Sequence, residues 1–304
     1  MGKIAFLFAG QGAQYTGMGQ SLYKAGGAAA EIFEMAERIR PGTLQDCFSA
    51  PAERLAQTAV TQPCVFVAAL AAAESLAEKG VAAGGAAGFS LGEMAALTFA
   101  KGFGQQQGFS LVCRRGQLMQ QAAENTPGAM AAVLKLSNAK VEALCQNFTQ
   151  MYPVNYNCED QLVVAGSAEQ IDEFCGQVKQ QGGLAKRLSV GGAFHSPFMG
   201  PAAAAFLQQL EEEPLRQPSI PVYANLTAAP YQASLNKVLA AQIKSPVLWS
   251  ASMLQMWNDG FDTFVEVGPG KTLTGLAKRI LPEARLYNVQ DAESLEKTAA
   301  ALQN

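Results

Sequence analysis

Short apolar runs alternate along the chain with longer stretches whose apolar positions recur at helical spacing. Residues 3–9 and residues 85–89 are apolar runs of strand length, and the first ends in a Gly-rich turn. Between them a helix is predicted from about residue 62 to residue 79, with Pro63 in its first turn and Gly80 as its C-terminal stop. This succession of strand, helix and strand predicts an α/β fold.

The pattern changes character between residues 128 and 191. Two helices, at residues 138–148 and 168–180, alternate there with four strands, at residues 129–136, 153–156, 161–165 and 184–190. The order β-α-β-β-α-β and a length of about sixty residues are typical of a ferredoxin-like unit. We therefore expect a ferredoxin-like subdomain of residues 128–191, inserted into a larger α/β domain made of residues 1–127 and 192–304.

A Gly-x-Ser-x-Gly sequence at residues 88–92 places Ser90 between a predicted strand and a predicted helix. At such a strand–turn–helix junction the serine hydroxyl stands exposed at the end of the sheet, as in α/β hydrolases, so the larger domain is expected to be α/β-hydrolase-like. The main-chain N–H of Leu91, at the positive end of the helix, is then an expected oxyanion donor. The alternative is a structural turn, because Gly and Ser are common in turns.

His195 is the only histidine in the chain. A serine is a poor nucleophile until a base within hydrogen-bond reach takes its proton, so if Ser90 uses a histidine it uses His195. The residue lies in a predicted loop, residues 191–197, that could present a side chain. A lone histidine is more often a satisfied core or surface residue than a catalyst, and its weight here comes from the pairing with Ser90.

Arg115 interrupts the apolar face of a helix predicted over residues 109–124, whereas Arg114 belongs to its polar face. A guanidinium that points into a core needs an anion, because it cannot lose its charge. One possible partner is an internal carboxylate, Glu93 or Glu124. The other is the carboxylate of a substrate, held by two parallel hydrogen bonds. The sequence leaves both possibilities open.

Composition and charge exclude several classes of protein. Hydrophobic residues make up 49% of the chain, and the net charge of −3 argues against nucleic acid as a partner. The Ala-rich stretch at residues 68–77 contains Glu74 and is not expected to span a membrane. Six cysteines without Cys-x-x-Cys spacing, and a single histidine, predict no metal site. The first apolar run is too short for a secretory signal, so a reduced, cytoplasmic protein is expected.

Six short blocks, spread over nearly the whole chain, occur in an order that few folds share. In chain order they are residues 8–14, 88–93, 115–116, 128–132, 193–196 and 266–273. Together they resemble the malonyl-CoA:acyl-carrier-protein transacylases of fatty acid and polyketide synthesis. The resemblance implies an acyltransferase that moves a malonyl group from malonyl-CoA, its substrate, to the phosphopantetheine thiol of acyl carrier protein. It implies a malonyl-serine intermediate and no cofactor.

The same resemblance implies a role for each motif residue. Ser90 would be the nucleophile and His195 its base. Arg115 would bind the malonyl carboxylate. The main-chain N–H of Gln11 would complete an oxyanion hole beside that of Leu91. The active site would lie in the cleft between the subdomain and the larger domain.

Two positions depart from the family's pattern. Phe89 stands where a histidine is often found, and Leu248 stands where many relatives have glutamine. The resemblance implies that the backbone carbonyl of Leu248 orients His195, which any side chain at that position permits. Phe194 resembles the members that take malonyl rather than methylmalonyl groups.

Two other classes of function share part of this pattern. An esterase or thioesterase would use Ser90 and His195 but has no need of an inward arginine, and it usually orients its histidine with a carboxylate. A non-catalytic module that docks carrier proteins would not need the intact set of Ser90, His195 and Arg115. The sequence therefore favours the transferase.

Overall fold

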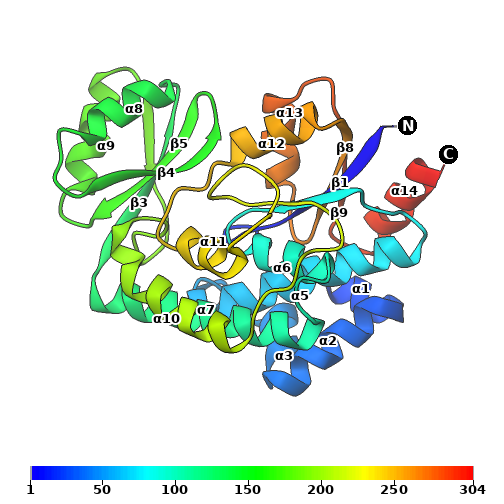
Figure 1. Ribbon diagram of the computed structural model, residues 1–304. Helices are drawn as coiled ribbons and strands as arrows, with labels where there is room; N and C mark the ends of the chain where they lie inside the picture. Colours follow the sequence, from blue (N-terminus) through cyan, green and yellow to red (C-terminus); the bar gives the residue numbers. More distant parts are fainter. Residues whose placement is uncertain (1, 304) are drawn as a thin grey trace.

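The computed structural model describes residues 2–303, which form two β-sheets of different kinds. The parallel sheet has the strand order β7-β2-β1-β8-β9, and the antiparallel sheet has the order β4-β5-β3-β6. Figure 1 shows the antiparallel sheet, in green, set to one side of the parallel sheet. The parallel strands are β1 (Lys3–Phe8), β2 (Gly85–Gly88), β7 (Val222–Tyr223), β8 (Phe261–Val267) and β9 (Arg285–Val289). The antiparallel strands are β3 (Gly128–Leu134), β4 (Met151–Cys158), β5 (Gln161–Ser167) and β6 (Leu184–Arg187).

Helices cover both faces of the parallel sheet because its side chains alternate between two apolar cores. Phe6 and Phe8 of β1 join the core formed with α5, α6 and α14, whereas Ala5 and Leu7 join the core formed with α12 and α13. These helices are α5 (Thr58–Glu78), α6 (Gly92–Phe99), α12 (Trp249–Asn258), α13 (Thr272–Ile280) and α14 (Ala292–Gln303). The remaining larger-domain helices are α1 (Gln20–Ala25), α2 (Gly27–Ile39), α3 (Thr43–Ser49), α4 (Ala52–Leu55), α7 (Gln105–Asn125), α10 (Gly200–Glu212) and α11 (Leu235–Gln242), with a 3-10 turn η1 (Pro197–Met199).

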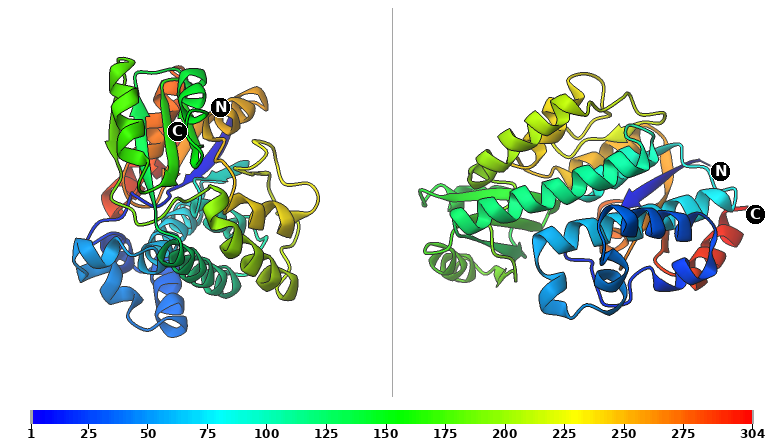
Figure 2. Two further views of the ribbon diagram at one scale, coloured as in Figure 1. Left: turned by 90° about the vertical axis from the view of Figure 1, so that its left-hand side faces the viewer. Right: turned by 90° about the horizontal axis from the view of Figure 1, so that it is seen from below.

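The central helix α5 is a core helix. It is long and apolar enough to cross a membrane, yet 89% of the apolar window lies buried inside the protein. It begins at Thr58, four residues earlier than the sequence pattern predicts, so Pro63 lies inside the helix rather than in its first turn. Its buried neighbours include α7, which runs along the molecule towards the antiparallel sheet (Figure 2, right).

The order of the parallel strands indicates at which edge of the sheet a ligand binds. Counted in chain order, the five strands are arranged 3-2-1-4-5, so the direction of winding reverses between β1 and β8. In sheets of this kind, ligands bind outside the carboxyl ends of the strands at the reversal. Gln11 follows β1, Ser90 follows β2, and both residues lie at that edge.

The antiparallel sheet contains the elements predicted for residues 128–191, in the predicted order. Helices α8 (Asn138–Cys145) and α9 (Ile171–Gln180) pack on one face of the sheet around a separate apolar core. Strand β4 also pairs with the segment before α12: Tyr156 donates to the carbonyl of Val247 at 3.0 Å, and Val247 donates to Val154 at 2.7 Å. This segment therefore links the antiparallel sheet to the larger domain, and residues from both sides line a cleft between the two sheets.

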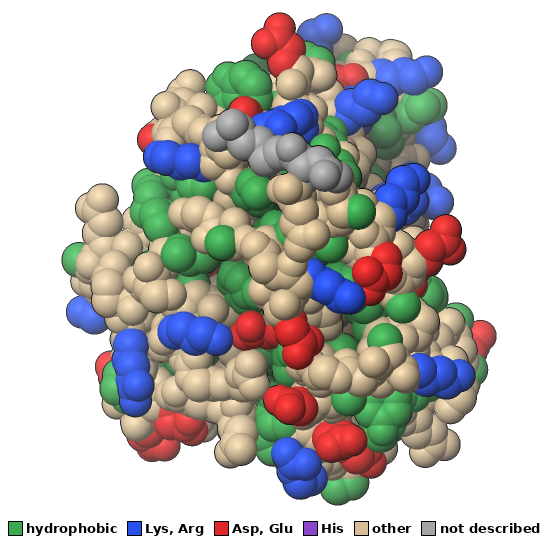
Figure 3. Space-filling view, turned by 90° about the vertical axis from the view of Figure 1, so that its right-hand side faces the viewer, with side chains coloured by type: hydrophobic (Ala, Val, Ile, Leu, Met, Phe, Trp, Pro, Cys, Tyr) green, Lys and Arg blue, Asp and Glu red, His purple; other side chains and the backbone are tan. Residues whose placement is uncertain are grey.

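The surface carries charges of both signs. On the face shown in Figure 3, basic and acidic side chains are interspersed, and hydrophobic side chains lie in small scattered groups. Such a surface lacks, on this face, the single-sign field that a protein uses to attract nucleic acid.

Candidate active site

Ser90 lies at a tight turn between β2 and α6. Its φ angle of 53° is in the left-handed region, which is strained for a residue with a side chain. A Cβ on Gly88 would collide with the backbone of Gly92, and a Cβ on Gly92 would collide with the carbonyl of Phe8. Only glycine fits at both positions because the backbone passes too close. The predicted strand–turn–helix junction is therefore present.

Ser90 and His195 are in direct contact. The Oγ atom of Ser90 is 2.7 Å from Nε2 of His195, and Nδ1 of His195 is 2.9 Å from the carbonyl oxygen of Gln242. Because a carbonyl oxygen only accepts, Nδ1 carries the proton, and Nε2 of the neutral ring is free to accept from the serine hydroxyl. Burial and the charge of Arg115 lower the pKa of His195 to about 4. The ring is thus a neutral base near pH 7.

The carbonyl that orients His195 belongs to Gln242, and the prediction of Leu248 was wrong. Gln242 is the last residue of α11, where the carbonyls of a helix lack intrahelical partners and accept from other groups. Leu248 immediately precedes α12, and its carbonyl accepts from the main-chain N–H of Ser252 at 2.9 Å in the first helical turn. Its oxygen is therefore already engaged, and its N–H donates to Asn225.

Arg115 is fully buried on α7, as its place on the apolar face predicts, whereas Arg114 is exposed. Its Nη1 donates to Oε1 of Gln62 at 2.6 Å, and its Nη2 donates to Oε1 of Gln242 at 2.8 Å. Nη2 also lies 3.4 Å from Oγ of Ser90, while Nε has no partner. Burial lowers the pKa of Arg115 to about 10, so the guanidinium stays charged.

Neither internal carboxylate considered for Arg115 forms an ion pair with it in the part of the chain that the structure describes. Glu124 accepts from Gln120, and the amide of Gln242 separates Arg115 from Glu93. Nε and Nη2 share one edge of the guanidinium plane, which can bind two oxygens of one carboxylate. Nη2 of this edge lies beside the Ser90 hydroxyl and also donates to Gln242, whereas Nε is an unpaired donor.

Two main-chain N–H groups beside Ser90 are free to hold a negative oxygen. Gly92 and Glu93 donate to carbonyls of the turn, but the N–H of Leu91 has no acceptor within residues 2–303. The N–H of Gln11 also lacks an acceptor among these residues. Gln11 lines, with Ser90 and His195, a cavity of about 80 Å³. Such preorganised donors are what an oxyanion hole requires.

Comparison with known proteins identifies the family. A family model described as an acyl transferase domain matches residues 5–299. A malonyl CoA-acyl carrier protein transacylase of Bacillus subtilis is 34% identical over 306 residues, which cover 97% of this chain and 96% of that protein. The chain belongs to the malonyl-CoA:acyl-carrier-protein transacylase family. The predicted resemblance is confirmed.

Solved structures of the transacylase family share the whole fold. The malonyl CoA-acyl carrier protein transacylase of Clostridium perfringens superposes with a TM-score of 0.95 at 32% identity, covering 99% of this chain and 97% of that one. A malonyl-transacylase solved in complex with a type II PKS acyl-carrier protein has a TM-score of 0.94 at 32% identity, covering 98% and 99% of the two chains. The mixed α/β architecture is therefore that of solved transacylases.

In this family member, buried amide side chains hold the backbone of the serine turn by hydrogen bonds. Oδ1 of Asn225 accepts from the N–H of Ser90 at 2.8 Å, and its Nδ2 donates to the carbonyl of Gly88 at 2.7 Å. Nε2 of Gln242 donates to the carbonyl of Ser90 at 2.8 Å. No sequence motif pointed to Asn225, Gln242 or Gln62. The only available signal was an isolated amide residue in an apolar stretch, which no motif distinguishes from others.

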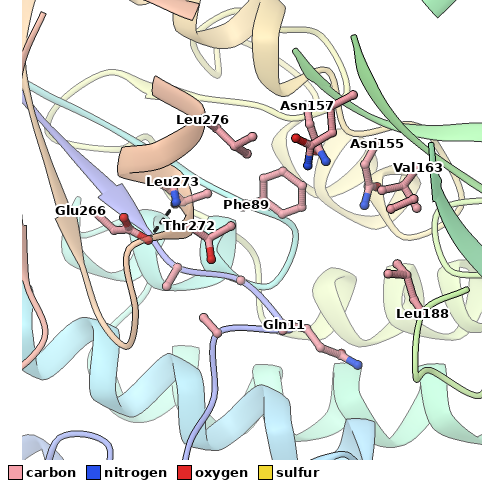
Figure 4. A pocket seen from close by; sticks show the side chains of 16 residues that line it. Gln11, Phe89, Asn155, Asn157, Val163, Leu188, Glu266, Thr272, Leu273 and Leu276 are labelled. Atoms are coloured by element: carbon pink, nitrogen blue, oxygen red, sulfur yellow. Dashed lines mark hydrogen bonds between the residues drawn. The ribbon is translucent and has the colours of Figure 1, made fainter. Parts of the chain in front are cut away.

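A larger cavity of about 250 Å³ lies next to the Ser90 site, in the cleft between the sheets. Gln11, Phe89, Asn155 and Leu188 border both cavities. Figure 4 shows the Phe89 ring between Leu273 and Leu276 of α13 on one side and Asn155 and Asn157 of β4 on the other. The Oδ1 atoms of both asparagines are buried without a partner. The cavity is thus largely apolar, and two asparagines with unpaired, buried oxygens line one wall.

Proposed function

We propose that this protein transfers the malonyl group of malonyl-CoA to the phosphopantetheine thiol of acyl carrier protein and so supplies extender units for fatty acid or polyketide synthesis. Membership of the transacylase family supports the reaction, and a relative solved with a type II PKS acyl-carrier protein supports the acceptor. The single observation that carries the choice of malonyl is Arg115, whose buried guanidinium lies beside the Ser90 hydroxyl and keeps Nε unpaired.

The reaction proceeds in two matched halves. His195 Nε2 takes the proton of Ser90 while Oγ attacks the thioester carbonyl, and the main-chain N–H groups of Gln11 and Leu91 hold the oxyanion. The C–S bond then breaks, and the CoA sulfur leaves with the proton from His195. In the second half, the carrier thiol loses its proton to His195 and attacks the malonyl-serine ester, and Ser90 leaves with that proton. A thioester-to-ester-to-thioester exchange is nearly balanced, so the proposal needs no cofactor or metal.

A thioesterase would perform the first half and then hydrolyse the ester. Intact-protein mass spectrometry distinguishes the two functions with the wild-type protein. After malonyl-CoA is added and removed, we expect a malonyl adduct that persists in buffer and is cleared by holo acyl carrier protein. An adduct that disappears as fast without the carrier as with it would assign the protein to the thioesterases.

The larger cavity is proposed to receive the pantetheine arm of both substrates. Pantetheine carries two amide N–H donors, and the largely apolar cavity is lined by Asn155 and Asn157, whose side-chain oxygens lack partners. The cavity shares four lining residues with the Ser90 site, so a thiol at the end of the arm would lie close to the nucleophile.

Replacing Asn157 by leucine should separate stability from activity. Asn157→Leu removes a buried unpaired oxygen, so the melting temperature should be unchanged or raised. The lost hydrogen bond to pantetheine should lower kcat/KM for malonyl-CoA by about threefold to tenfold. Asn138 also has a buried unpaired oxygen but lies on α8, outside the cavity, so Asn138→Leu is the matched control. Equal kcat/KM in both variants would contradict the assignment.

The pKa of His195 sets the acid limit of the first half-reaction. Because burial lowers this pKa to about 4, the neutral base persists to lower pH than an ordinary histidine allows. At saturating malonyl-CoA the rate of serine malonylation should therefore stay level from pH 8 to about pH 5 and fall below it. Rapid-quench mass spectrometry measures the rate, and circular dichroism checks that the fold survives. A fall centred near pH 6.5 would show that the ring is charged in the site.

We infer that residues 128–191 are a ferredoxin-like subdomain inserted between residues 1–127 and 192–304. The strand order β4-β5-β3-β6 is 2-3-1-4 in the unit's own numbering, and this supports the inference. The larger domain is α/β-hydrolase-like in its serine turn, whereas its strand order is that of a doubly wound sheet. Six free cysteines support a reducing, cytoplasmic location.

A further inference from the structure

Glu93 is a buried carboxylate that takes no part in the steps above. It lies on the first turn of α6, three residues after Ser90, and none of its surface is exposed. Its oxygens accept from the N–H of Asn225 at 2.7 Å, from Nε2 of Gln242 at 3.4 Å, and from the hydroxyl of Tyr231. None of these donors is charged. A buried anion without a contacting cation is costly, so its charge needs another source of stabilisation.

The charge of Glu93 is stabilised by Arg115, which lies on the other side of the Gln242 side-chain amide. The Nε2 atom of Gln242 donates to Glu93, while its Oε1 accepts from Nη2 of Arg115 at 2.8 Å. Within residues 2–303 neither charged group has an ion pair of its own. The amide of Gln242 therefore bridges two opposite buried charges, each of which stabilises the other.

We propose, on the basis of the proposed function, that Glu93 is the counter-ion of Arg115 in the empty site and takes up a proton when the malonyl carboxylate binds Arg115. The substrate carboxylate neutralises the guanidinium and adds a second anion to the same buried site. Both effects favour the uncharged form of Glu93. The hydrogen bonds of Glu93 also fix Gln242 and Asn225, so the same side chain positions the clamp and the serine turn.

Among the titratable groups around Arg115, Glu93 is the one that can take up a proton near neutral pH. Burial raises its pKa to about 7, against the lowering effect of its hydrogen bonds and of Arg115. Burial raises the pKa of Tyr231 well above its ordinary value, and the pKa of His195 is about 4. Between pH 7 and 8, Tyr231 stays protonated and His195 stays neutral, whereas Glu93 is poised to gain a proton.

Proton uptake in a single turnover tests the proposal on the wild-type protein. The protein is mixed with malonyl-CoA at pH 7.5 in weak buffer containing a pH indicator, and mass spectrometry gives the acylated fraction. We expect uptake of about half a proton per malonylated serine, beyond that for acetyl-CoA, whose acyl group has no carboxylate. Release of the CoA thiol contributes equally to both reactions. Equal uptake with the two donors would overturn the proposal.

The variant Glu93→Gln tests which group takes the proton. Adduct formation on Ser90 should be slower because Glu93 also positions the turn, but the excess uptake per malonylated serine should vanish, and uptake at the wild-type level would overturn the proposal. If the variant does not fold, the pH dependence of the malonylation equilibrium of the wild-type protein tests the proposal instead. The malonylation constant should fall about fivefold relative to the acetylation constant between pH 7 and 9, and a constant ratio overturns the proposal. Failure of the proposed function would instead leave the wild-type serine without any malonyl adduct.

Discussion

The variant Ser90→Ala should form no covalent adduct with malonyl-CoA. The Ser90 hydroxyl contacts the base, 2.7 Å from Nε2 of His195, and lies beside the guanidinium of Arg115. Removing its oxygen removes the atom that accepts the acyl group. Intact-protein mass spectrometry after mixing with malonyl-CoA measures the result directly. An adduct of malonyl mass on the Ser90→Ala protein would show that another residue is the nucleophile.

The variant His195→Ala should retain the nucleophile but lose its activation. Removal of one member of such a pair typically slows acylation by about 10⁴-fold or more. Ser196→Ala is a suitable control because the Ser196 hydroxyl donates to the carbonyl of Ala193 and accepts from Phe198, away from the catalytic contact. Adduct formation by His195→Ala at a rate close to that of the control would contradict the assigned base.

The variant Arg115→Ala should reverse the preference between malonyl-CoA and acetyl-CoA. A malonyl carboxylate without the guanidinium is left desolvated and unpaired, which costs about 3–5 kcal/mol and lowers kcat/KM by hundreds-fold or more. The acetyl group has no carboxylate and gains nothing from Arg115. Transfer of acetyl should be unchanged or raised. Measurement of kcat/KM for both donors with the same carrier protein gives the ratio.

Arg114→Ala is the matched control for Arg115→Ala. Arg114 is the preceding residue of α7, and its side chain is exposed, whereas that of Arg115 is fully buried. Its removal should leave the malonyl preference intact. An Arg115→Ala protein that is folded by circular dichroism and still prefers malonyl-CoA would show that the arginine has only a structural role.

Local patterns determined much of this protein from the sequence. The β-α-β-β-α-β succession of residues 128–191 follows from short-range periodicity, and the strand–Ser90–helix turn was predicted from the Gly-x-Ser-x-Gly sequence between a strand pattern and a helix pattern. The inward direction of Arg115 follows from helical spacing alone, since neighbouring residues on a helix point about 100° apart. With one histidine in the chain, the partner of Ser90 followed as well.

The tertiary structure alone decided which groups complete the site. Every helix ends with unpaired carbonyls, so the sequence could not show that Gln242, and not Leu248, orients His195. Gln242 and Asn225 reach the turn across 152 and 135 residues of chain, and an amide side chain carries no periodic signal of such a contact. The bridge from Glu93 to Arg115 likewise exists only after α6, α7 and α11 have packed together. Hydrophobic spacing specifies which residues go inside, but the partners that buried polar groups find there depend on the packing of distant segments.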